Sequence, residues 1–371
     1  MLAFCVGWPT SGQARPAEAP PFGPLAISPD DQLVGRSLLE PEESFDLYDY
    51  DKRLVSQRPL GLGPSLPRVG TTPEFAGLGP WYNSSPLTLA SLRGKVVLVA
   101  FWTHSSSNCI RTLPYLEQYW ARYQNRPFVV VGIHTPEYMF EESPQNVAAA
   151  VEHYGLTFPV AQDDEYATWN AFGNRYWPAL YLIDPSGTVR YIQLGEGAYE
   201  ETDLAIRSLL GERGRLPSGV LIGSDAATES PAPGQSPEIY LGTRSWPAFA
   251  NGRDEPDGEV HRYLAPAALA LHQYALVGTW RLVEDERQML AGFEGELLIH
   301  ARAGEVNLLL GLEPGTPPGT ADVVVDGNPV ESIVVDRHDL FNLWSGPYAE
   351  HEVTVLIHGR GVAAYAFTFS H

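Results

Sequence analysis

The chain has 371 residues and a formal net charge of −21, because 45 Asp and Glu residues face 24 Lys and Arg residues. This length allows two domains and a sizeable core, whereas the negative charge argues against a nucleic-acid partner or an anionic membrane surface. Two cysteines, Cys5 and Cys109, are too few for a disulfide framework, and no apolar run reaches the ~20 residues that a membrane-spanning helix needs.

The first 71 residues are expected to form a mostly irregular arm. Residues 1–8 are apolar, but they lack a basic flank and are short for the core of a signal peptide. Residues 9–70 are rich in Pro, Gly, Ser and acidic residues, and their helical periodicity is poor. The start of the chain therefore gives no convincing export signal.

The next stretch predicts a buried strand followed by a helix. Val96 to Trp102 is a continuous apolar run rich in β-branched and aromatic residues, which is typical of a strand buried on both faces. A short polar loop follows at 104–108, and apolar residues at helical spacing come after it, with Pro114 inside the pattern. A strand, a tight loop and a kinked helix with Cys109 near its N-terminus resemble the active-site corner of a thioredoxin fold.

The rest of the first domain continues with alternating elements. A serine N-cap and a proline at the first helical position predict a helix that starts at Pro144, and Pro185-Ser186-Gly187 is a predicted hairpin turn. The expected elements are a buried strand at 128–134, helices at 144–154, 166–172 and 200–210, and a hairpin at 181–192. These elements predict an α/β thioredoxin-like domain over residues 72–211.

A second domain is expected after a linker. Residues 212–237 are rich in Gly, Pro and Ser, so we interpret them as the linker. Residues 238–371 contain many short apolar runs separated by turn residues, and Asp326-Gly327 is a strong hairpin signal. Short strands without helices predict an all-β sandwich, of the jelly-roll or carbohydrate-binding-module kind.

Three stretches connect the chain with a known family. They are Leu-Arg-Gly-Lys-Val-Val-Leu-Val at 92–99, Val-Val-Gly-Ile-His-Thr-Pro-Glu at 130–137, and Tyr-Ala-Thr-Trp-Asn-Ala-Phe-Gly-Asn-Arg-Tyr-Trp-Pro-Ala at 166–179. Through them, residues 72–371 resemble the extracytoplasmic part of DipZ-type cytochrome c biogenesis proteins, relatives of TlpA-like thioredoxins. The resemblance implies a thiol-disulfide oxidoreductase outside the cytoplasm, with a protein thiol or disulfide as partner; the cytoplasm is the alternative compartment.

The expected catalytic residues are Ser106 and Cys109, and Ser106 departs from the family pattern. The family has Cys-x-x-Cys, and here Ser106 replaces the first cysteine. The first thiolate of such a motif attacks a disulfide, and the second cysteine resolves the mixed disulfide. A serine hydroxyl stays protonated and attacks sulfur poorly. The sequence therefore excludes ordinary dithiol exchange and leaves at most a residual single-thiol activity at Cys109.

Two other functions stay open at this motif. In one, Cys109 is a buried remnant and the domain is a non-catalytic binding module. In the other, Ser106-x-x-Cys109 resembles the Thr/Ser-x-x-Cys of peroxiredoxins, in which a hydroxyl one helical turn before the cysteine hydrogen-bonds the thiolate. Trp102 stands where the peroxiredoxin proline would be. Whether the chain is an enzyme is left undecided.

The candidate substrate-binding residues are Trp102, Trp177 and Pro178. Trp177-Pro178 resembles the cis-proline loop opposite the active site of thioredoxin folds, where the preceding backbone pairs with an extended peptide. Trp102 and Tyr176 are expected to line the same cleft, although packing in the core explains such aromatic residues nearly as well.

No cofactor and no metal site are expected. The ten histidines are scattered without metal-ligand spacing, and His104 is expected to be a solvated loop residue or a neighbour of the Cys109 thiolate. Gly195-x-Gly197 lacks the third glycine of a dinucleotide loop. The sandwich offers a glycan site as an alternative partner surface, with aromatic rings that are suited to sugar stacking at Trp280, Phe341, Trp344 and Tyr348.

Overall fold

The computed structural model describes residues 66–211, 219–224, 232–252 and 258–371. The predictions for residues 1–65, including the arm and the export signal, lie outside this part of the chain. The same holds for 212–218 and 225–231, which make up much of the expected linker.

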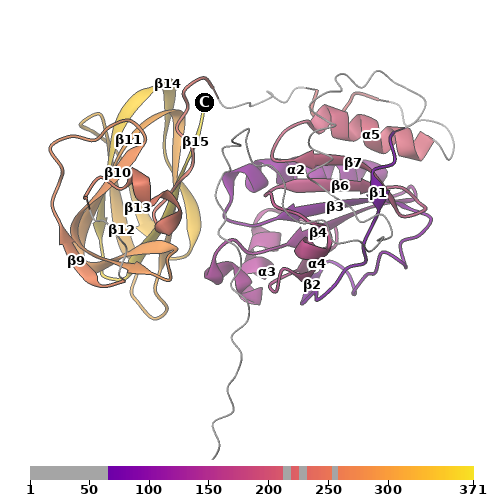
Figure 1. Ribbon diagram of the computed structural model, residues 1–371, viewed down its shortest axis with the longest axis horizontal. Helices are drawn as coiled ribbons and strands as arrows, with labels where there is room; N and C mark the ends of the chain where they lie inside the picture. Colours follow the sequence, from indigo (N-terminus) through magenta and orange to yellow (C-terminus); the bar gives the residue numbers. More distant parts are fainter. Residues whose placement is uncertain (1–65, 212–218, 225–231, 253–257) are drawn as a thin grey trace, which may run out of the picture. The chain divides into compact units, whose positions relative to one another are not determined.

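The first domain is built on a seven-stranded sheet of order β1-β7-β6-β3-β4-β5-β2 (Figure 1). At its centre, β3 pairs parallel with β4 and antiparallel with β6. The strands are β1 (Gly70–Thr71), β2 (Trp81–Tyr82), β3 (Val96–Trp102), β4 (Phe128–His134), β5 (Val160–Gln162), β6 (Ala179–Ile183) and β7 (Thr188–Leu194). This sheet takes in β1, two residues before the start of the domain expected at Thr72.

Helices cover both faces of this sheet because β3 is apolar on both sides. Val96, Leu98, Ala100 and Trp102 belong to one core cluster, together with residues of α2, α3 and α5, and the alternate residues of β3 belong to another cluster with α4. The helical elements are α2 (Ser107–Tyr123), η1 (Met139–Glu142), α3 (Pro144–His153), α4 (Ala167–Ala171) and α5 (Tyr199–Gly211). The fold is a thioredoxin-like α/β sandwich.

The helix starts follow the capping residues in the sequence. Ser106 is the N-cap of α2, and Ser143 is the N-cap of α3, with Pro144 at the first helical position. Each serine side chain accepts a hydrogen bond from the backbone N–H three residues on, at 3.4 Å. Pro114 lies inside α2, as predicted.

Part of the expected linker is packed against the first domain. Ile222 is buried in the α2–α5 core, and its backbone N–H donates to the Asp203 carboxylate at 2.9 Å. Arg122 and Arg207 both donate to the carbonyl oxygen of Val220. Residues 220–222 therefore extend the first domain beyond α5, in a stretch that composition alone assigns to a linker.

The C-terminal part is an antiparallel β-sandwich of eight strands around one large apolar core. The strands and the short helix between them are β8 (Ile239–Tyr240), η2 (Thr243–Ala248), β9 (Val260–Tyr263), β10 (Gln273–Val283), β11 (Arg287–Leu312), β12 (Gly319–Val325), β13 (Asn328–Val335), β14 (Asp339–His358) and β15 (Val362–Ser370). The long strand β11 pairs with β10, β14 and β15. The predicted hairpin turn at Asp326-Gly327 joins β12 to β13, and both residues have positive φ.

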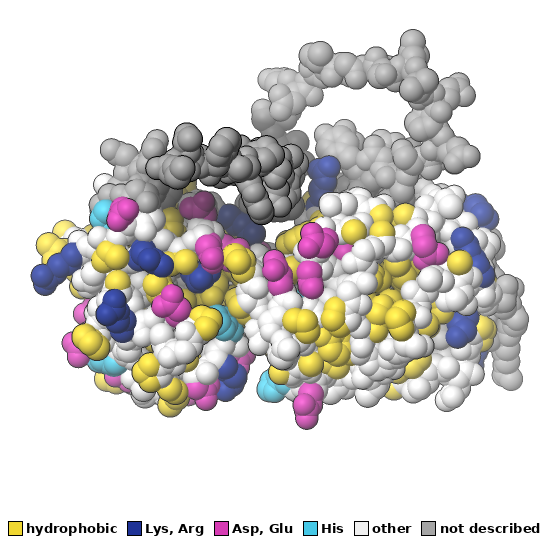
Figure 2. All heavy atoms as spheres, turned by 90° about the horizontal axis from the view of Figure 1, so that it is seen from below, with side chains coloured by type: hydrophobic (Ala, Val, Ile, Leu, Met, Phe, Trp, Pro, Cys, Tyr) yellow, Lys and Arg dark blue, Asp and Glu magenta, His cyan; other side chains and the backbone are white. Residues whose placement is uncertain are grey.

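Charged side chains are dispersed over the surface. On the face shown in Figure 2, Lys and Arg side chains lie among Asp and Glu side chains and do not gather into one basic patch. Among the described helices, none combines the length and the apolar composition that crossing a bilayer requires.

Candidate functional site

The turn after β3 holds the two expected catalytic residues. Ser106 has extended backbone (φ −81°, ψ 121°), and its Oγ accepts from the N–H of Cys109, the third residue of α2. Cys109 is only 1% exposed and packs in the core cluster with Leu113 and Leu116. The structure therefore brings Ser106 and Cys109 together but keeps the sulfur out of solvent.

Burial controls the chemistry of this thiol. Loss of solvation raises the pKa of Cys109 to about 12, against smaller opposing contributions from hydrogen bonds with Thr103 and Ser106. The carboxylates of Glu137 and Glu141 raise it further. A pKa this high favours the neutral thiol over the thiolate at physiological pH.

Trp102 does not line a cleft as predicted. It is 1% exposed, at the end of a strand whose residues are all buried, and its ring meets the imidazole of His134 edge-on at 5.1 Å between centroids. The indole lies beside Gly132 of β4, where an added Cβ would be 3.2 Å from Trp102 Nε1 and 3.0 Å from Phe158 Cε2. Trp102 is therefore a core residue, and the missing side chain at Gly132 leaves room for its indole ring.

The loop before β6 matches the resemblance in its geometry. The Trp177–Pro178 peptide bond is cis, and Trp177 Nε1 donates to the carbonyl oxygen of Thr135 at 3.0 Å. The Trp177 ring also packs against Trp169, at 4.2 Å between centroids. Tyr176 is 46% exposed, so it offers an aromatic side chain to solvent, whereas Trp177 is held by the domain.

A second group of polar side chains lies at the same edge of the sheet. His104 follows β3, His134 ends β4, and Glu141 belongs to η1. His104 Nδ1 is 2.9 Å from His134 Nε2 and 3.9 Å from Glu141 Oε1. Burial lowers the pKa of His104 and lowers that of His134 well below its usual range. His104 is therefore not the solvated loop residue that the sequence suggests.

Glu141 is the most constrained member of this group. It is fully buried. Oε1 accepts from Ser105 N at 3.1 Å and from Ser105 Oγ at 2.6 Å, and Oε2 accepts from the N–H groups of Glu137 at 2.6 Å and Tyr138 at 3.1 Å. Three backbone N–H groups and one hydroxyl thus converge on the two oxygens of this side chain. Glu141 thereby ties the loop after β3 to the loop after β4.

Sequence reasoning did not single out His134 and Glu141. The usable signal was that His134 ends a buried strand parallel to the one that precedes His104, since the carboxyl ends of parallel strands meet at one edge of a sheet. The in-register pair Trp102–His134 brings these two histidines together across 30 residues of sequence.

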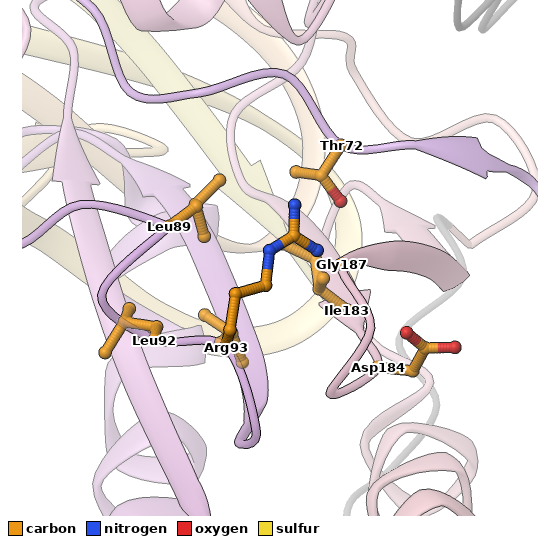
Figure 3. A pocket seen from close by; sticks show the side chains of 8 residues that line it. Thr72, Leu89, Leu92, Arg93, Ile183, Asp184 and Gly187 are labelled. Atoms are coloured by element: carbon orange, nitrogen blue, oxygen red, sulfur yellow. The ribbon is translucent and has the colours of Figure 1, made fainter.

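One small pocket of the first domain lies away from this turn. Figure 3 shows Arg93 reaching across a pocket of about 10 Å³, beside Thr72, Ile183 and Gly187. Arg93 Nη1 donates to the carbonyl oxygen of Ser186, and a side chain at Gly187 would meet this guanidinium. Such a volume holds a single water molecule. This arginine therefore closes the hairpin turn between β6 and β7.

The aromatic residues expected to bind glycans are divided by burial. Trp280 is fully buried in the sandwich core and cannot stack on a sugar. Phe341 and Trp344 are partly buried against the same core, and Tyr348 is 37% exposed. A pocket of about 180 Å³ in the sandwich has no aromatic lining; its charged members are Arg281, Glu313 and Arg360. The sugar-stacking platform predicted from the sequence is therefore not assembled around Trp280.

Comparison with known proteins places the chain. The AhpC/TSA family model matches residues 72–192, and the model described as thioredoxin like C-terminal domain matches residues 236–370. Protein DipZ of Mycobacterium tuberculosis is 34% identical over 312 residues, which are 82% of this chain and 43% of DipZ. The thiol-disulfide oxidoreductase ResA of Geobacillus thermodenitrificans is 30% identical over 33% of this chain and 67% of ResA. The crystal structure of the thioredoxin-like superfamily protein SPOA0173 covers 40% of this chain and 99% of its own, at 28% identity and a TM-score of 0.37.

The fold and the similarity to ResA place the chain among thioredoxin-like proteins of the thiol-disulfide oxidoreductase class. More specifically, the chain is similar to DipZ over 82% of its length, and its C-terminal β-sandwich matches the thioredoxin like C-terminal domain model. It spans less than half of the length of DipZ.

Proposed function

We propose that this chain is a DipZ/TlpA-type thioredoxin-like protein whose Ser106–Cys109 turn no longer exchanges disulfides. At most it keeps a residual single-thiol activity. The observation that carries the proposal is the burial of Cys109, which is 1% exposed behind a serine. Neither residue presents a reactive sulfur to a protein substrate.

Two chemical requirements fail at this turn. Disulfide exchange needs an attacking thiolate, and a thiol with a pKa of about 12 is ionised in about one molecule in 10⁵ at pH 7. Exchange also needs access, because the attacking sulfur must reach the disulfide. Ser106 is more accessible than Cys109, but its hydroxyl cannot replace the missing thiolate.

The peroxidase alternative meets the same obstacle. A peroxidatic cysteine needs a depressed pKa and access for the oxidant. The hydrogen bond from Ser106 lowers the pKa of Cys109, but the effect of burial is larger and the net direction is upward. The geometry therefore supports peroxide reduction less well than a loss of thiol chemistry.

A non-catalytic binding module is the second candidate. It is favoured by the exposed ring of Tyr176 beside the fixed indole of Trp177. A suitable probe is a permanently unfolded protein such as reduced, carboxymethylated lactalbumin. Its binding, followed by fluorescence anisotropy, should weaken several-fold in Tyr176→Ala. Equal binding by wild type and variant would remove this candidate.

Insulin reduction with dithiothreitol as the electron donor tests the main proposal. The wild-type chain should stay at the uncatalysed rate, and Ser106→Cys should gain activity because it restores the attacking sulfur at the N-cap. Ser106→Cys combined with Cys109→Ser is the matched control and should not turn over. Wild-type activity equal to that of a thioredoxin would overturn the proposal.

The compartment is proposed from the resemblance to DipZ-type proteins. We place the chain outside the cytoplasm, where its partner would be an exported protein. Fractionation of the native host, with the chain recovered from the cytoplasm alone, would contradict this placement.

A further inference from the structure

We propose that His104, His134 and Glu141 bind one divalent transition-metal ion of the zinc type. One ligand atom from each side chain can be chosen so that all three atoms lie within 4.8 Å of one another. This site does not depend on the thiol and extends the function proposed above. It also replaces the expectation from the sequence that the chain has no metal site.

The ligand set suits such an ion. Two imidazole nitrogens and a carboxylate oxygen are an established combination for zinc, with a fourth position left for water or another small ligand. Bonds of about 2.0–2.1 Å in a tetrahedral arrangement place ligand atoms about 3.3 Å apart. The distances here are 2.9 Å between the two histidines and 3.9 Å between His104 Nδ1 and Glu141 Oε1. Shifts of less than about 1 Å would bring these atoms into the coordination sphere.

At least one of the two facing imidazole nitrogens already presents a lone pair to the other. Only one proton fits between His104 Nδ1 and His134 Nε2 at 2.9 Å, so at least one of these nitrogens is an unprotonated acceptor. A metal ion between them would take the place of that proton. The rings are nearly parallel, with 22° between their planes, so both nitrogens can turn toward one point by small rotations.

The surroundings hold the ligands in place. Trp102 meets the His134 ring edge-on, and Phe140 meets the His104 ring edge-on at 5.6 Å. Glu141 is held by its four hydrogen bonds. Its proposed ligand atom, Oε1, accepts two of them, from Ser105 Oγ at 2.6 Å and from Ser105 N at 3.1 Å. A set of ligands fixed by packing and by further hydrogen bonds loses little entropy on binding a metal.

The charge in this region also calls for a cation. Glu141 is fully buried, and within the described ranges its ion-pair neighbour is His104, at 3.9 Å. An ionised carboxylate in a low-dielectric environment is costly without a counter-charge. Asp203, the other fully buried carboxylate discussed above, has the guanidinium of Arg207 at 2.9 Å. At Glu141 a divalent ion would supply the charge that arginine supplies at Asp203.

Access is limited to one side of the cluster. The side chains of His134 and Glu141 are buried, whereas that of His104 is 11% exposed. A metal ion would therefore enter past His104, and the exchange of a bound ion should be slow.

The experiment uses the full-length, untagged chain after treatment with EDTA. Co²⁺ is the probe because its visible absorption bands report a four-coordinate nitrogen and oxygen environment. We expect one Co²⁺ per chain, displaced by Zn²⁺ at equal stoichiometry. Since loss of a group that merely supports a ligand costs 10–100-fold in affinity, His104→Gln should lower the affinity by more than about 100-fold.

His153→Gln is the matched control, because this histidine is exposed at the end of α3, and it should bind as the wild type does. Thermal melts in EDTA keep a folding defect apart from a binding defect. His104 is also the least buried ligand, so His104→Gln is expected to stay folded. The proposal is overturned if the folded wild type shows no Co²⁺ bands, or if His104→Gln binds as tightly as His153→Gln.

Discussion

The turn after β3 carries two buried groups whose chemistry differs. On one side, Cys109 lies among apolar side chains, and burial keeps its sulfur protonated. On the other, His104, His134 and Glu141 lie within reach of one another, and hydrogen bonds satisfy both oxygens of the Glu141 side chain. The difference teaches that burial opposes the ionisation of a lone thiol but preorganises a set of mutually satisfied polar atoms. Each prediction below breaks or sharpens this contrast.

The largest effect is expected for alkylation of Cys109. In a Cys5→Ser variant, the native chain at pH 8 should react with iodoacetamide roughly 10³-fold more slowly than a free thiol of pKa ~8.5, because its thiolate fraction is smaller by that factor. The raised pKa also sets the pH dependence. The rate should keep rising about tenfold per pH unit between pH 7 and 10, whereas a free thiol levels off near its own pKa.

Mass spectrometry of the alkylated chain gives this rate. The same chain in concentrated urea is the control and should react at the rate of a free thiol. A fast native rate that levels off below pH 9 would show that Cys109 is exposed and acidic, and the contrast with the polar cluster would fail.

Removal of the Glu141 carboxylate should cause the next largest effect. Glu141→Ala leaves the N–H groups of Ser105, Glu137 and Tyr138 without their acceptor, and we expect a loss of about 3 kcal/mol in the free energy of unfolding. Glu117→Ala is the control, because Glu117 also accepts from a backbone N–H and a hydroxyl, both of Thr157, but near the surface. It should cost about 1 kcal/mol. Equal losses in urea unfolding, read by tryptophan fluorescence, would mean that burial adds nothing at Glu141.

Ser106→Ala should have a smaller effect, on stability alone. The Oγ of Ser106 caps α2, so its loss should cost about 1 kcal/mol and leave the alkylation rate of Cys109 within a few-fold. Ser143→Ala at the start of α3 removes a capping hydrogen bond of the same length, 3.4 Å, and should lower the free energy of unfolding by the same amount. If Ser106→Ala changed the alkylation rate of Cys109 strongly and Ser143→Ala did not, the main role of Ser106 would be its interaction with the Cys109 sulfur, and not the capping of α2.

The smallest effect is expected at the exposed edge of the corner. Arg111 on α2 makes a bidentate ion pair with Glu196, with contacts of 2.8 and 2.7 Å. Because both side chains are partly exposed, Arg111→Ala should cost less than about 1 kcal/mol, and about 1 M salt should remove most of that difference. A double-mutant cycle with Glu196→Ala measures the coupling; a salt-independent coupling above about 2 kcal/mol would contradict surface screening.

Local sequence patterns were sufficient to predict most of the strands and helices. The apolar run predicted as a strand has the bounds of β3, and the run at 128–134 has those of β4, because a strand buried on both faces leaves a continuous apolar signature. Ser143-Pro144 marked the start of α3 because capping and proline geometry are local. The packing of residues 220–222 was not predicted from the sequence. These residues are held by hydrogen bonds with Asp203 and Arg207 of α5, which a local pattern at 220–222 does not reveal.

The site was predictable only where chemistry follows sequence spacing. Ser106 and Cys109 are three residues apart, so one helical turn unites them. His134 and Glu141 contribute through the β3–β4 register and the position of η1, and spacing along the chain carries no sign of either. The exposure of aromatic residues was also beyond the sequence, since Trp102 and Trp280 are core residues in a pattern that fits a cleft or a sugar-binding face equally well.

Gly132 gives the cluster an unexpected vulnerability. It makes no polar contact with His104, His134 or Glu141, yet a single methyl group added there would press on Trp102 and Phe158 at 3.2 and 3.0 Å. Trp102 in turn rests against the imidazole of His134. Gly132→Ala is therefore expected to shift Trp102 by a few tenths of an ångström and, through this ring, the imidazole of His134, so a position without polar chemistry helps to set the geometry of the cluster.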